Sequence, residues 1–275
     1  MRTAAAEREA CRYLGRLIQD RCGIQMQPGK EALIKARLGR RMRQYGLKSL
    51  SAYCDFLREQ EDEEELAGVV DALTIHFTNF LREQEHFQFM VEEALPVPRE
   101  RQEQRFHVWS AASSSGEEAY TIGMYLAEHS AAMSGCDWRV SASDVSAKML
   151  EKARLGVYTE ERVRTLPRQW VRKYFQRGVG NWEGHYRVKR LIADRITFRQ
   201  INLMEDYSHT HAFDMIFLRN VLIYLDRSIQ EQLVRRVCQF LAPQGHLLIG
   251  HSENLTGLNV PLRSLRPSIY QHNLE

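Results

Sequence analysis

Apolar residues recur at helical spacing through the first third of the chain. The first stripe contains Tyr13, Leu14, Leu17 and Ile18, and it ends at Gly23. Similar spacing predicts further helices over residues 30–45, 50–57, 61–73 and 82–95. Prolines 96 and 98 and the charged run 99–105 then break the pattern. We therefore predict an N-terminal all-helical domain over residues 1–95 and a linker over residues 96–105.

The pattern changes after residue 105, where short apolar runs alternate with helical stretches. The apolar runs predict strands at residues 106–111, 138–142, 196–201, 213–218 and 246–250. The stretches between them predict helices at residues 117–129, 146–155 and 228–241. Strands that alternate with helices favour a parallel sheet covered on both faces. Residues 106–275 are therefore expected to form an α/β domain.

One segment interrupts this alternation. Residues 175–188 (FQRGVGNWEGHYRV) combine glycines with alternating aromatic residues. Such a pattern is typical of a β-hairpin, so we predict an inserted β-subdomain at about residues 170–190.

Composition narrows the class of protein. The 275 residues are 44% hydrophobic, and no apolar stretch or signal-peptide core indicates membrane insertion or secretion. Five scattered cysteines suggest reduced thiols, so we expect a cytoplasmic protein. No cysteine or histidine spacing predicts a metal site. A net charge of +3 is too small to indicate nucleic-acid binding.

The first candidate site is the turn within residues 108–126 (VWSAASSSGEEAYTIGMYL). Small residues end a strand and precede a helix, which lets a ligand approach the backbone and the free amides of the helix start. Such a turn often binds phosphate, but Glu117 and Glu118 occupy the helix start. Their charge favours a cationic cofactor such as S-adenosylmethionine, whereas the alternative is acidic residues that only stabilise the helix.

Three further positions carry polar groups at strand ends. Asp144 follows a strand and can accept both hydroxyls of a ribose, or it can cap the next helix. Ser146 is also suited to capping, which leaves Asp144 freer for a ligand. Arg219 and Asn220 end the buried strand of FDMIFLRNVLIYLD, where ligands bind in open α/β folds, and Tyr224 follows.

Taken together, the motifs resemble the CheR-type chemotaxis receptor methyltransferases. The resemblance covers nearly the whole chain and rests on TNFLRE (78–83), WSAASSSGEEAY (109–120), ASDVSAKMLEKARLGVY (142–158), INL (201–203), FLRNVLIYLD (217–226) and GHLLIGHSENL (245–255). It implies a small helical domain joined to a Rossmann-like domain with a β-subdomain. It also implies methylation of chemoreceptor glutamates by S-adenosylmethionine, which yields methyl esters and S-adenosylhomocysteine.

The resemblance also implies roles for single residues. Thr78 and Arg82 match the residues at the domain junction, with the arginine near the transferred methyl group, and Tyr224 matches the tyrosine that faces the reaction centre. The implied cofactor contacts are His76 (usually asparagine in the family), Thr78, Arg82, Glu118 or its neighbour Glu117, Asp144, Asn202, Leu203, Arg219 and Asn220. Leu81 and Ser115 replace a common phenylalanine and threonine.

The mechanism needs little acid–base chemistry, because a glutamate is already ionised at pH 7. We hypothesise that Arg82 compensates the desolvated substrate carboxylate and that Tyr224 donates a hydrogen bond beside it. Basic residues concentrated in 30–48 could dock the acidic receptor bundle, although a solvated helix face is the alternative. The resemblance also implies a second docking element, because in some family members the β-subdomain binds a receptor's C-terminal peptide as an added strand. The hairpin 175–188 could bind such a peptide, although a glycine-rich hairpin is also ordinary surface structure.

Other functions remain open at this stage. The chain could methylate another protein or RNA, although no RNA-binding module is evident. It could also be a non-catalytic protein that binds the cofactor. A monomer is the default expectation.

Overall fold

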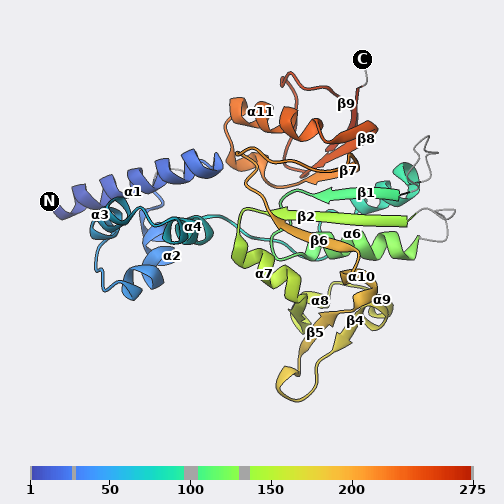
Figure 1. Cartoon of the computed structure of the whole chain (residues 1–275), viewed down its shortest axis with the longest axis horizontal. Coiled ribbons are helices and arrows are strands. Elements are labelled where there is room, and N and C mark those ends of the chain that lie inside the picture. The colour runs from blue at the N-terminus through green and yellow to red at the C-terminus, as the bar shows by residue number, and fades with distance from the viewer. Residues whose placement is uncertain (1, 27–28, 96–104, 130–136, 274–275) are drawn as a thin grey trace. The chain divides into compact units, whose positions relative to one another are not determined.

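The computed structural model describes residues 2–26, 29–95, 105–129 and 137–273. Its contacts divide the chain into two compact units. The helical unit comprises residues 1–75 with the short segment 224–229, and the sheet unit comprises residues 76–223 and 230–275. Each unit has its own core, so each is described separately (Figure 1).

The helical unit contains α1 (Arg2–Cys22), α2 (Glu31–Gln44), α3 (Leu50–Gln60) and α4 (Glu63–Leu73). These bounds agree with the helices predicted from apolar spacing. On α2 the buried residues are Ile34, Leu38 and Met42, which lie four positions apart along one face. Ser49 and Asp62 cap α3 and α4 by accepting hydrogen bonds from backbone amides.

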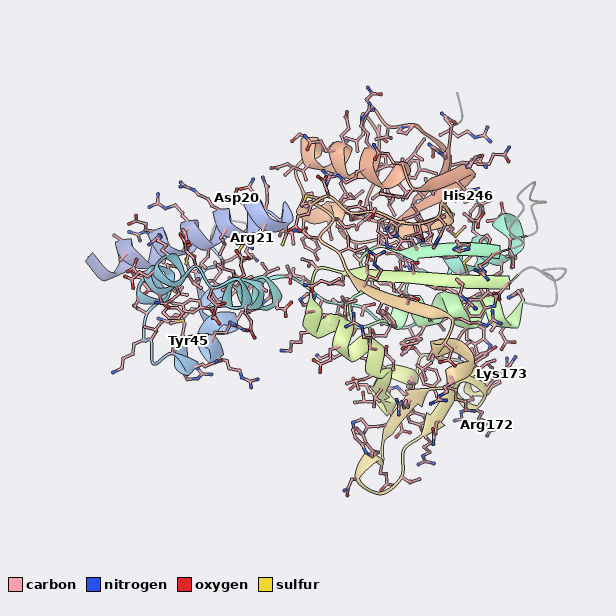
Figure 2. All side chains as sticks on the ribbon, in the orientation of Figure 1. Asp20, Arg21, Tyr45, Arg172, Lys173 and His246 are labelled. Carbon is pink, nitrogen blue, oxygen red and sulfur yellow. The ribbon has the colours of Figure 1, made fainter. Side chains whose placement is uncertain are left out.

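Ion pairs tie the helices of this unit together. Arg21, labelled in Figure 2, makes a bidentate pair with Glu63 at 2.6 and 2.8 Å. Glu65 is 2% exposed and accepts hydrogen bonds from Arg41 and from the hydroxyls of Tyr45 and Tyr53. We call these four residues the Glu65 cluster: Glu65, Arg41, Tyr45 and Tyr53.

The sheet unit is built on a seven-stranded sheet, counted among the described residues, in the order β6-β2-β1-β7-β8-β10-β9. Its strands are β1 (Arg105–Ser110), β2 (Asp137–Asp144), β6 (Ile196–Gln200), β7 (Phe213–Leu218), β8 (Leu241–Ile249), β9 (Leu262–Arg266) and β10 (Ile269–His272). The first five in space are parallel, and β10 and β9 are antiparallel. The predicted α/β class is therefore confirmed.

Helices cover the parallel part of the sheet. They include α6 (Glu117–Glu128), α7 (Ala147–Leu155), α10 (Arg190–Ala193) and α11 (Arg227–Cys238). Figure 1 shows α6 and α7 beside β2 and β6. Every residue of β7 is buried, as expected for a central parallel strand. The predicted strand at residues 246–250 begins earlier, at Leu241, and β9 and β10 were not predicted.

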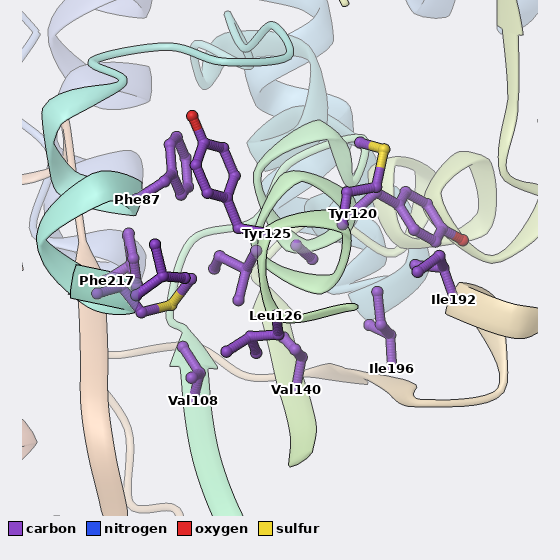
Figure 3. Packing of buried hydrophobic residues seen from close by; sticks show 14 of the residues in the cluster. Phe87, Val108, Tyr120, Tyr125, Leu126, Val140, Ile192, Ile196 and Phe217 are labelled. Carbon is purple, nitrogen blue, oxygen red and sulfur yellow. The ribbon is translucent and has the colours of Figure 1, made fainter. Parts of the chain in front are cut away.

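The predicted domain boundary was placed too late in the chain. The helix α5 (Glu85–Phe89) and a π-helical turn (Met90–Ala94) belong to the sheet unit, because their apolar residues pack in its core. Phe87 stacks on Tyr125 and Phe217 at centroid distances of 5.3 and 5.6 Å (Figure 3). The units therefore divide between Ile75 and His76. The predicted linker falls at 96–105, of which residues 96–104 lie outside the described residues.

The predicted β-subdomain is larger than one hairpin. Strands β4 (Phe175–Arg177) and β5 (His185–Val188) pair antiparallel, which confirms the hairpin, and β3 (Val157–Thr159) adds a third strand on the other side of β5. Between β3 and β4 lie α8 (Glu160–Val163) and α9 (Arg168–Tyr174). The insertion therefore begins at about residue 157. Three residues of β3 are too few for apolar periodicity to reveal.

Among the described residues, no helix combines the length and the hydropathy needed to cross a membrane.

Candidate functional site

The turn between β1 and α6 lies at the carboxyl end of the sheet's first strand. Its backbone has left-handed conformations at Ser114 (φ 48°) and Gly116 (φ 95°). A Cβ at Gly116 would lie 2.9 Å from the Cβ of Ala153 and 3.1 Å from the hydroxyl of Tyr158. Only glycine satisfies both the dihedral and the space, so the turn is tightly fixed.

Asp144 holds this turn from the neighbouring strand. One carboxylate oxygen accepts from the amide of Ser114 at 2.8 Å, and the other accepts from the amide of Ser146 at 2.9 Å. Ser146 itself caps α7, since its hydroxyl accepts from the amide of Met149 at 3.1 Å. The predicted capping role of Ser146 is therefore confirmed, and Asp144 connects the ends of β1 and β2.

Arg219 is the centre of a buried network at the end of β7. Its side chain is 1% exposed and contacts Glu83 at 3.0 Å and Glu118 at 3.0 Å. A third acceptor is the carbonyl of Arg82 at 2.5 Å, and Glu118 also accepts from the hydroxyl of Ser110 at 2.7 Å. We call Arg219, Glu83 and Glu118 the Arg219 cluster.

The Arg219 cluster lies at the topological switch point of the sheet. Strand β1 has β2 on one side and β7 on the other. From β1 the chain first builds the sheet outward through β2 and β6, and it then returns to add β7 and β8 on the opposite side of β1. Arg219 follows β7, and Glu118 reaches Ser110 at the end of β1. Ligands of open α/β sheets bind at this place.

Burial and ion pairing act in opposite directions on the two carboxyl groups. Burial raises the pKa of Glu118, and the nearby guanidinium of Arg219 only partly offsets it. Burial also acts on Glu83, but Arg219 and Asn220 outweigh it and lower the pKa of that carboxyl. Two glutamates in one network with opposite shifts are typical of functional sites.

Asn220 adopts a left-handed backbone (φ 57°) just after the strand end. Glu253, which is 7% exposed, accepts from the amides of Asn220 at 2.9 Å, Ile223 at 3.2 Å and Gly250 at 2.5 Å. The side-chain amide of Asn220 approaches Glu83 at 3.3 Å. Glu253 therefore fixes the backbone that presents Arg219 and Asn220.

The two adjacent glutamates of the turn have different surroundings. Glu117 is 1% exposed, and its carboxylate accepts from Arg162 at 2.9 Å and from the hydroxyl of Ser115 at 2.7 Å. Arg162 comes from α8 and also donates to the carbonyl of Thr78 at 2.7 Å. Glu117 thus connects the turn to the β-subdomain, whereas Glu118 faces the Arg219 cluster.

The segment 76–83 supplies the remaining residues near the cluster. Arg82 is 30% exposed, donates to the carbonyl of Phe77 at 3.0 Å and lies 4.0 Å from Glu83. Its neighbours Leu81 (φ 58°) and Glu83 (φ 53°) both have left-handed backbones. Such strain in non-glycine residues is concentrated at functional sites. The expected junction segment belongs, by its contacts, to the sheet unit.

The other expected residues are placed as follows. The hydroxyl of Ser114 donates to the carbonyl of His76 at 3.1 Å, and Thr78 is buried beside Arg162. Asn202 closes a turn after β6 by accepting from the amide of Met204 at 3.1 Å. The carbonyl of Leu203 accepts from Arg236 at 3.0 Å.

Tyr224 is not grouped with these residues. Its backbone carbonyl accepts from the amide of Gln25 at 2.9 Å, and the contact division places it in the helical unit. Its role beside the reaction centre stays a prediction.

Sequence reasoning did not identify Glu83, Glu253 or Arg162 as part of the site. Glu83 lies in the motif at residues 78–83 and Glu253 in the motif at residues 245–255. Only the folded structure shows that Glu83 accepts from the side chain of Asn220 and that Glu253 accepts from its backbone amide. Arg162 lies in a charged helix with no distinctive spacing, so nothing in the sequence pointed to its contact with Glu117.

Two family models match the chain. The model described as "CheR methyltransferase, SAM binding domain" matches residues 76–270, and that described as "CheR methyltransferase, all-alpha domain" matches residues 9–74. The chain is also similar to proteins named chemotaxis protein methyltransferase. That of Salmonella typhimurium is 39% identical over 248 residues, covering 90% of this chain and 84% of the relative. That of Borreliella burgdorferi is 32% identical over 265 residues, covering 94% and 92%.

Solved structures give weaker likenesses. The glycopeptide N-methyltransferase MtfA complexed with sinefungin has a TM-score of 0.39 and 16% identity, covering 72% of this chain and 60% of that one. The DhpI–SAH complex has a TM-score of 0.35 and 17% identity, covering 71% of each chain. Scores this low support no conclusion about the site.

Proposed function

Because the chain belongs to the CheR methyltransferase family, we propose that it transfers the methyl group of S-adenosylmethionine to glutamate carboxylates of chemoreceptors, forming methyl esters. The two family matches meet at the boundary between the compact units, at residues 74–76. The cofactor of this family's second domain is S-adenosylmethionine, as expected from the sequence. The acceptor group and the roles of single residues are the proposed part.

The charge of the Arg219 cluster is the observation that carries this proposal. Two carboxylates, Glu83 and Glu118, surround one buried guanidinium, so acidic side chains outnumber basic ones within this buried cluster at the switch point. S-adenosylmethionine has a sulfonium, an ammonium and a carboxylate, and therefore one net positive charge. A pyrophosphate would instead be repelled by these glutamates. The residues present fit the expected cofactor.

Of the two acidic candidates, Glu118 is the better cofactor contact. The partners of Glu117 are Ser115 within the turn and Arg162 of the β-subdomain, so its carboxylate is directed away from the end of β7. Glu118 lies in the cluster at the end of β7, where Arg219 and Asn220 are also presented. We assign Glu117 to the support of the turn.

The remaining cofactor contacts follow the strand ends. Asp144 lies at the end of β2, where a carboxylate accepts ribose hydroxyls in related folds. Asn202 and Leu203 follow the adjacent strand β6 and are proposed to flank the adenine. His76 and Thr78 complete the proposed set from the segment that Ser114 and Arg162 hold.

The protein's part in the reaction is to orient and desolvate the acceptor. When bound, S-adenosylmethionine supplies an electrophilic methyl group and leaves as a neutral thioether. Arg82 is partly exposed and retains N–H donors beyond its bond to Phe77, so it can receive the substrate carboxylate. Tyr224 is proposed to donate a hydrogen bond to the same carboxylate. No general base is needed, because that carboxylate is ionised at neutral pH.

The basic segment 30–48 separates into two sets. Arg41 pairs with Glu65, and Arg37 donates to the carbonyls of Leu73 and Thr74, so these two serve the helical unit. The exposed set is Lys30, Lys35, Arg40, Arg43 and Lys48. We propose that this exposed set docks the acidic helical bundle of the receptor.

The β-subdomain offers a second docking element. Strand β4 is paired with β5 on one side and is an edge strand of its sheet among the described residues. A receptor's C-terminal peptide could add a strand along it. We propose that the protein acts in the cytoplasm and as a monomer.

A radiolabelled methyl assay on receptor fragments tests the function. Base-labile label on glutamate would support ester formation. Base-stable label on the receptor would indicate another acceptor group, and label on RNA would indicate another substrate class. Cofactor binding without any transfer would indicate a binding protein. Fragments with and without the C-terminal tail would separate the two docking elements.

A further inference from the structure

His86 has one ring nitrogen without a hydrogen-bond partner. The imidazole is fully buried, and Nε2 lies 2.8 Å from the hydroxyl oxygen of Ser268. That hydroxyl donates to the carbonyl of Pro267 at 2.7 Å, so its oxygen accepts the Nε2 proton. Nδ1 is therefore an unprotonated lone pair, and it has no hydrogen-bond partner.

This lone pair faces a carboxylate. Nδ1 lies 3.6 Å from Oε2 of Glu83, and both atoms are acceptors. Two buried acceptors that face each other are unfavourable unless a positive or polarised atom lies between them. The exposed ring of His251 lies beside them, perpendicular to the His86 ring at a centroid distance of 4.9 Å.

We propose that Glu83, His86 and His251 bind a divalent transition-metal ion such as Zn²⁺. One ligand atom from each residue lies within 4.8 Å of the other two. Bonds of about 2.1 Å in tetrahedral geometry place ligand atoms roughly 3.4 Å apart. The existing 3.6 Å between His86 and Glu83 matches this spacing, and the exposed His251 can move inward.

The chemistry of the ligand set agrees with this ion. Two imidazoles and one carboxylate, with a fourth position open to water, form a common zinc set. Ligating histidines usually donate their second N–H to an oxygen, as His86 does to Ser268. Glu83 and His86 are three positions apart, but His251 comes from a distant segment, so sequence spacing could not reveal the set.

Nearby charges bear on the site in both directions. Arg219 and Arg82 are cationic neighbours of Glu83, whereas Glu85 lies 3.3 Å from Nε2 of His251 and adds negative charge. Arg219 also contacts Glu118 and the Arg82 carbonyl. Arg219 therefore keeps an anionic partner when Glu83 turns toward a metal.

Metal binding should therefore inhibit methyl transfer. A Glu83 carboxylate drawn to the ion holds Arg219 and Asn220 less firmly, and both belong to the proposed cofactor site. This consequence rests on the proposed function, whereas the binding of the ion does not.

Isothermal titration of the full, metal-free chain with zinc chloride tests the site. We expect one ion per chain, and Co²⁺ in its place should give the visible absorption of a tetrahedral ion. His251→Ala should weaken Zn²⁺ binding at least about 10-fold. His185→Ala, which removes a partly exposed histidine of the β-subdomain, should leave the affinity unchanged, with circular dichroism confirming that both variants fold.

Several results would overturn the site. These are the absence of Zn²⁺ binding, an affinity unaffected by His251→Ala, or a thiolate-to-cobalt absorption band, which would indicate cysteine ligands. Inhibition by Zn²⁺ should be lost in His251→Ala, whose metal-free activity should be normal. A wild-type chain that binds Zn²⁺ without inhibition contradicts the coupling to Arg219. Failure to methylate receptors without metal contradicts the proposed function and leaves the binding result standing.

Discussion

Two networks in this chain are each built around a buried charged side chain, but they serve different purposes. The Glu65 cluster of the helical unit surrounds one carboxylate with an arginine and two tyrosine hydroxyls. The Arg219 cluster of the sheet unit surrounds one guanidinium with two carboxylates. The N–H and O–H donors of the first match the acceptor capacity of its single carboxylate. The second has more carboxylates than guanidinium groups.

The backbone around the two networks differs as well. Glu65 and Arg41 lie within regular helices, whereas left-handed residues flank the Arg219 cluster at Leu81, Glu83 and Asn220. Strain of this kind costs about 1–3 kcal/mol per residue and persists only where the surroundings enforce it. The satisfied network serves the fold, and the strained, charged network is suited to a ligand that completes it.

Replacing Arg219 should give the largest effect on cofactor binding. Arg219→Met leaves two buried carboxylates without their cation, and breaking such a pair costs about 3–5 kcal/mol. We expect the affinity for S-adenosylmethionine, measured by isothermal titration, to fall by more than about 100-fold. Arg219→Lys is the matched control and should retain part of the affinity. Unchanged affinity in Arg219→Met would show that the Arg219 cluster is not part of the cofactor site.

A change at Arg82 should lower turnover and leave cofactor affinity nearly unchanged. Arg82 lies beside Glu83 but is 30% exposed, so its loss should not disturb the buried pair. Arg82→Ala should lower turnover by roughly two orders of magnitude if it supplies ~3 kcal/mol of transition-state stabilisation. Cofactor affinity should change far less, as measured by the same titration. Near-normal turnover with the cofactor bound would refute this role.

A change in the Glu65 cluster should affect stability alone. Glu65→Gln replaces a buried carboxylate that accepts from Arg41, Tyr45 and Tyr53, and lost hydrogen bonds to a charged group cost about 2 kcal/mol. We expect this loss in the free energy of unfolding, measured in urea. The affinity for S-adenosylhomocysteine should stay within about twofold of wild type. A large loss of affinity would show that the helical cluster also serves the cofactor.

Sequence patterns predicted the helical unit and the parallel strands well, because the spacing of apolar residues along the chain follows the side of each helix or strand that is buried. They failed where contacts between distant segments decide the outcome. Residues 85–94 have an ordinary helical pattern, and only the packing of Phe87 on Tyr125 assigns them to the sheet unit. The short strand β3 is likewise defined by its pairing with β5.

The candidate site shows the same limit. The position of Asp144 and Arg219 at strand ends followed from the strand pattern, and the structure places both there. Local sequence could not distinguish Glu117 from Glu118, because Arg162 and Arg219, which separate them, are distant in the chain. Glu253 accepts from the amides of Asn220 and Ile223, which are distant in the chain, so local sequence could not reveal that it fixes this backbone.

Acidification should affect the two networks at different pH. Burial acts against the charge of Glu65, but Arg41 and the two tyrosines lower the pKa of its carboxyl overall. Its stabilisation is thus fully present above the unfolded value of about 4.3, and it is lost only as the pH falls through the lower folded value. Burial raises the pKa of Glu118, so this group takes up a proton above the ordinary glutamate range.

The affinity for S-adenosylmethionine should therefore weaken in mild acid before the helical unit loses structure. Each pH unit below the raised pKa of Glu118 should cost up to about tenfold in affinity. Titrations from pH 7 to pH 5, with circular dichroism at each point, measure both changes. Glu118→Gln is the control, and its weaker binding should vary less with pH. Simultaneous loss of binding and helical structure would contradict the difference between the networks.

The smallest effect is expected from substitutions on the exposed side of α2. Arg40 and Arg43 are exposed, whereas Arg41 between them is held by Glu65. Reversing Arg40 and Arg43 to glutamate should leave stability nearly unchanged, because an exposed charge contributes about 0–1 kcal/mol. If the exposed set docks an acidic receptor bundle, KM for receptor fragments should rise several-fold at low salt and less at high salt. Arg41→Glu should instead destabilise the helical unit, because it places two carboxylates together. An unchanged KM in the double variant would indicate that Arg40 and Arg43 belong to an ordinary solvated helix face and do not dock the receptor.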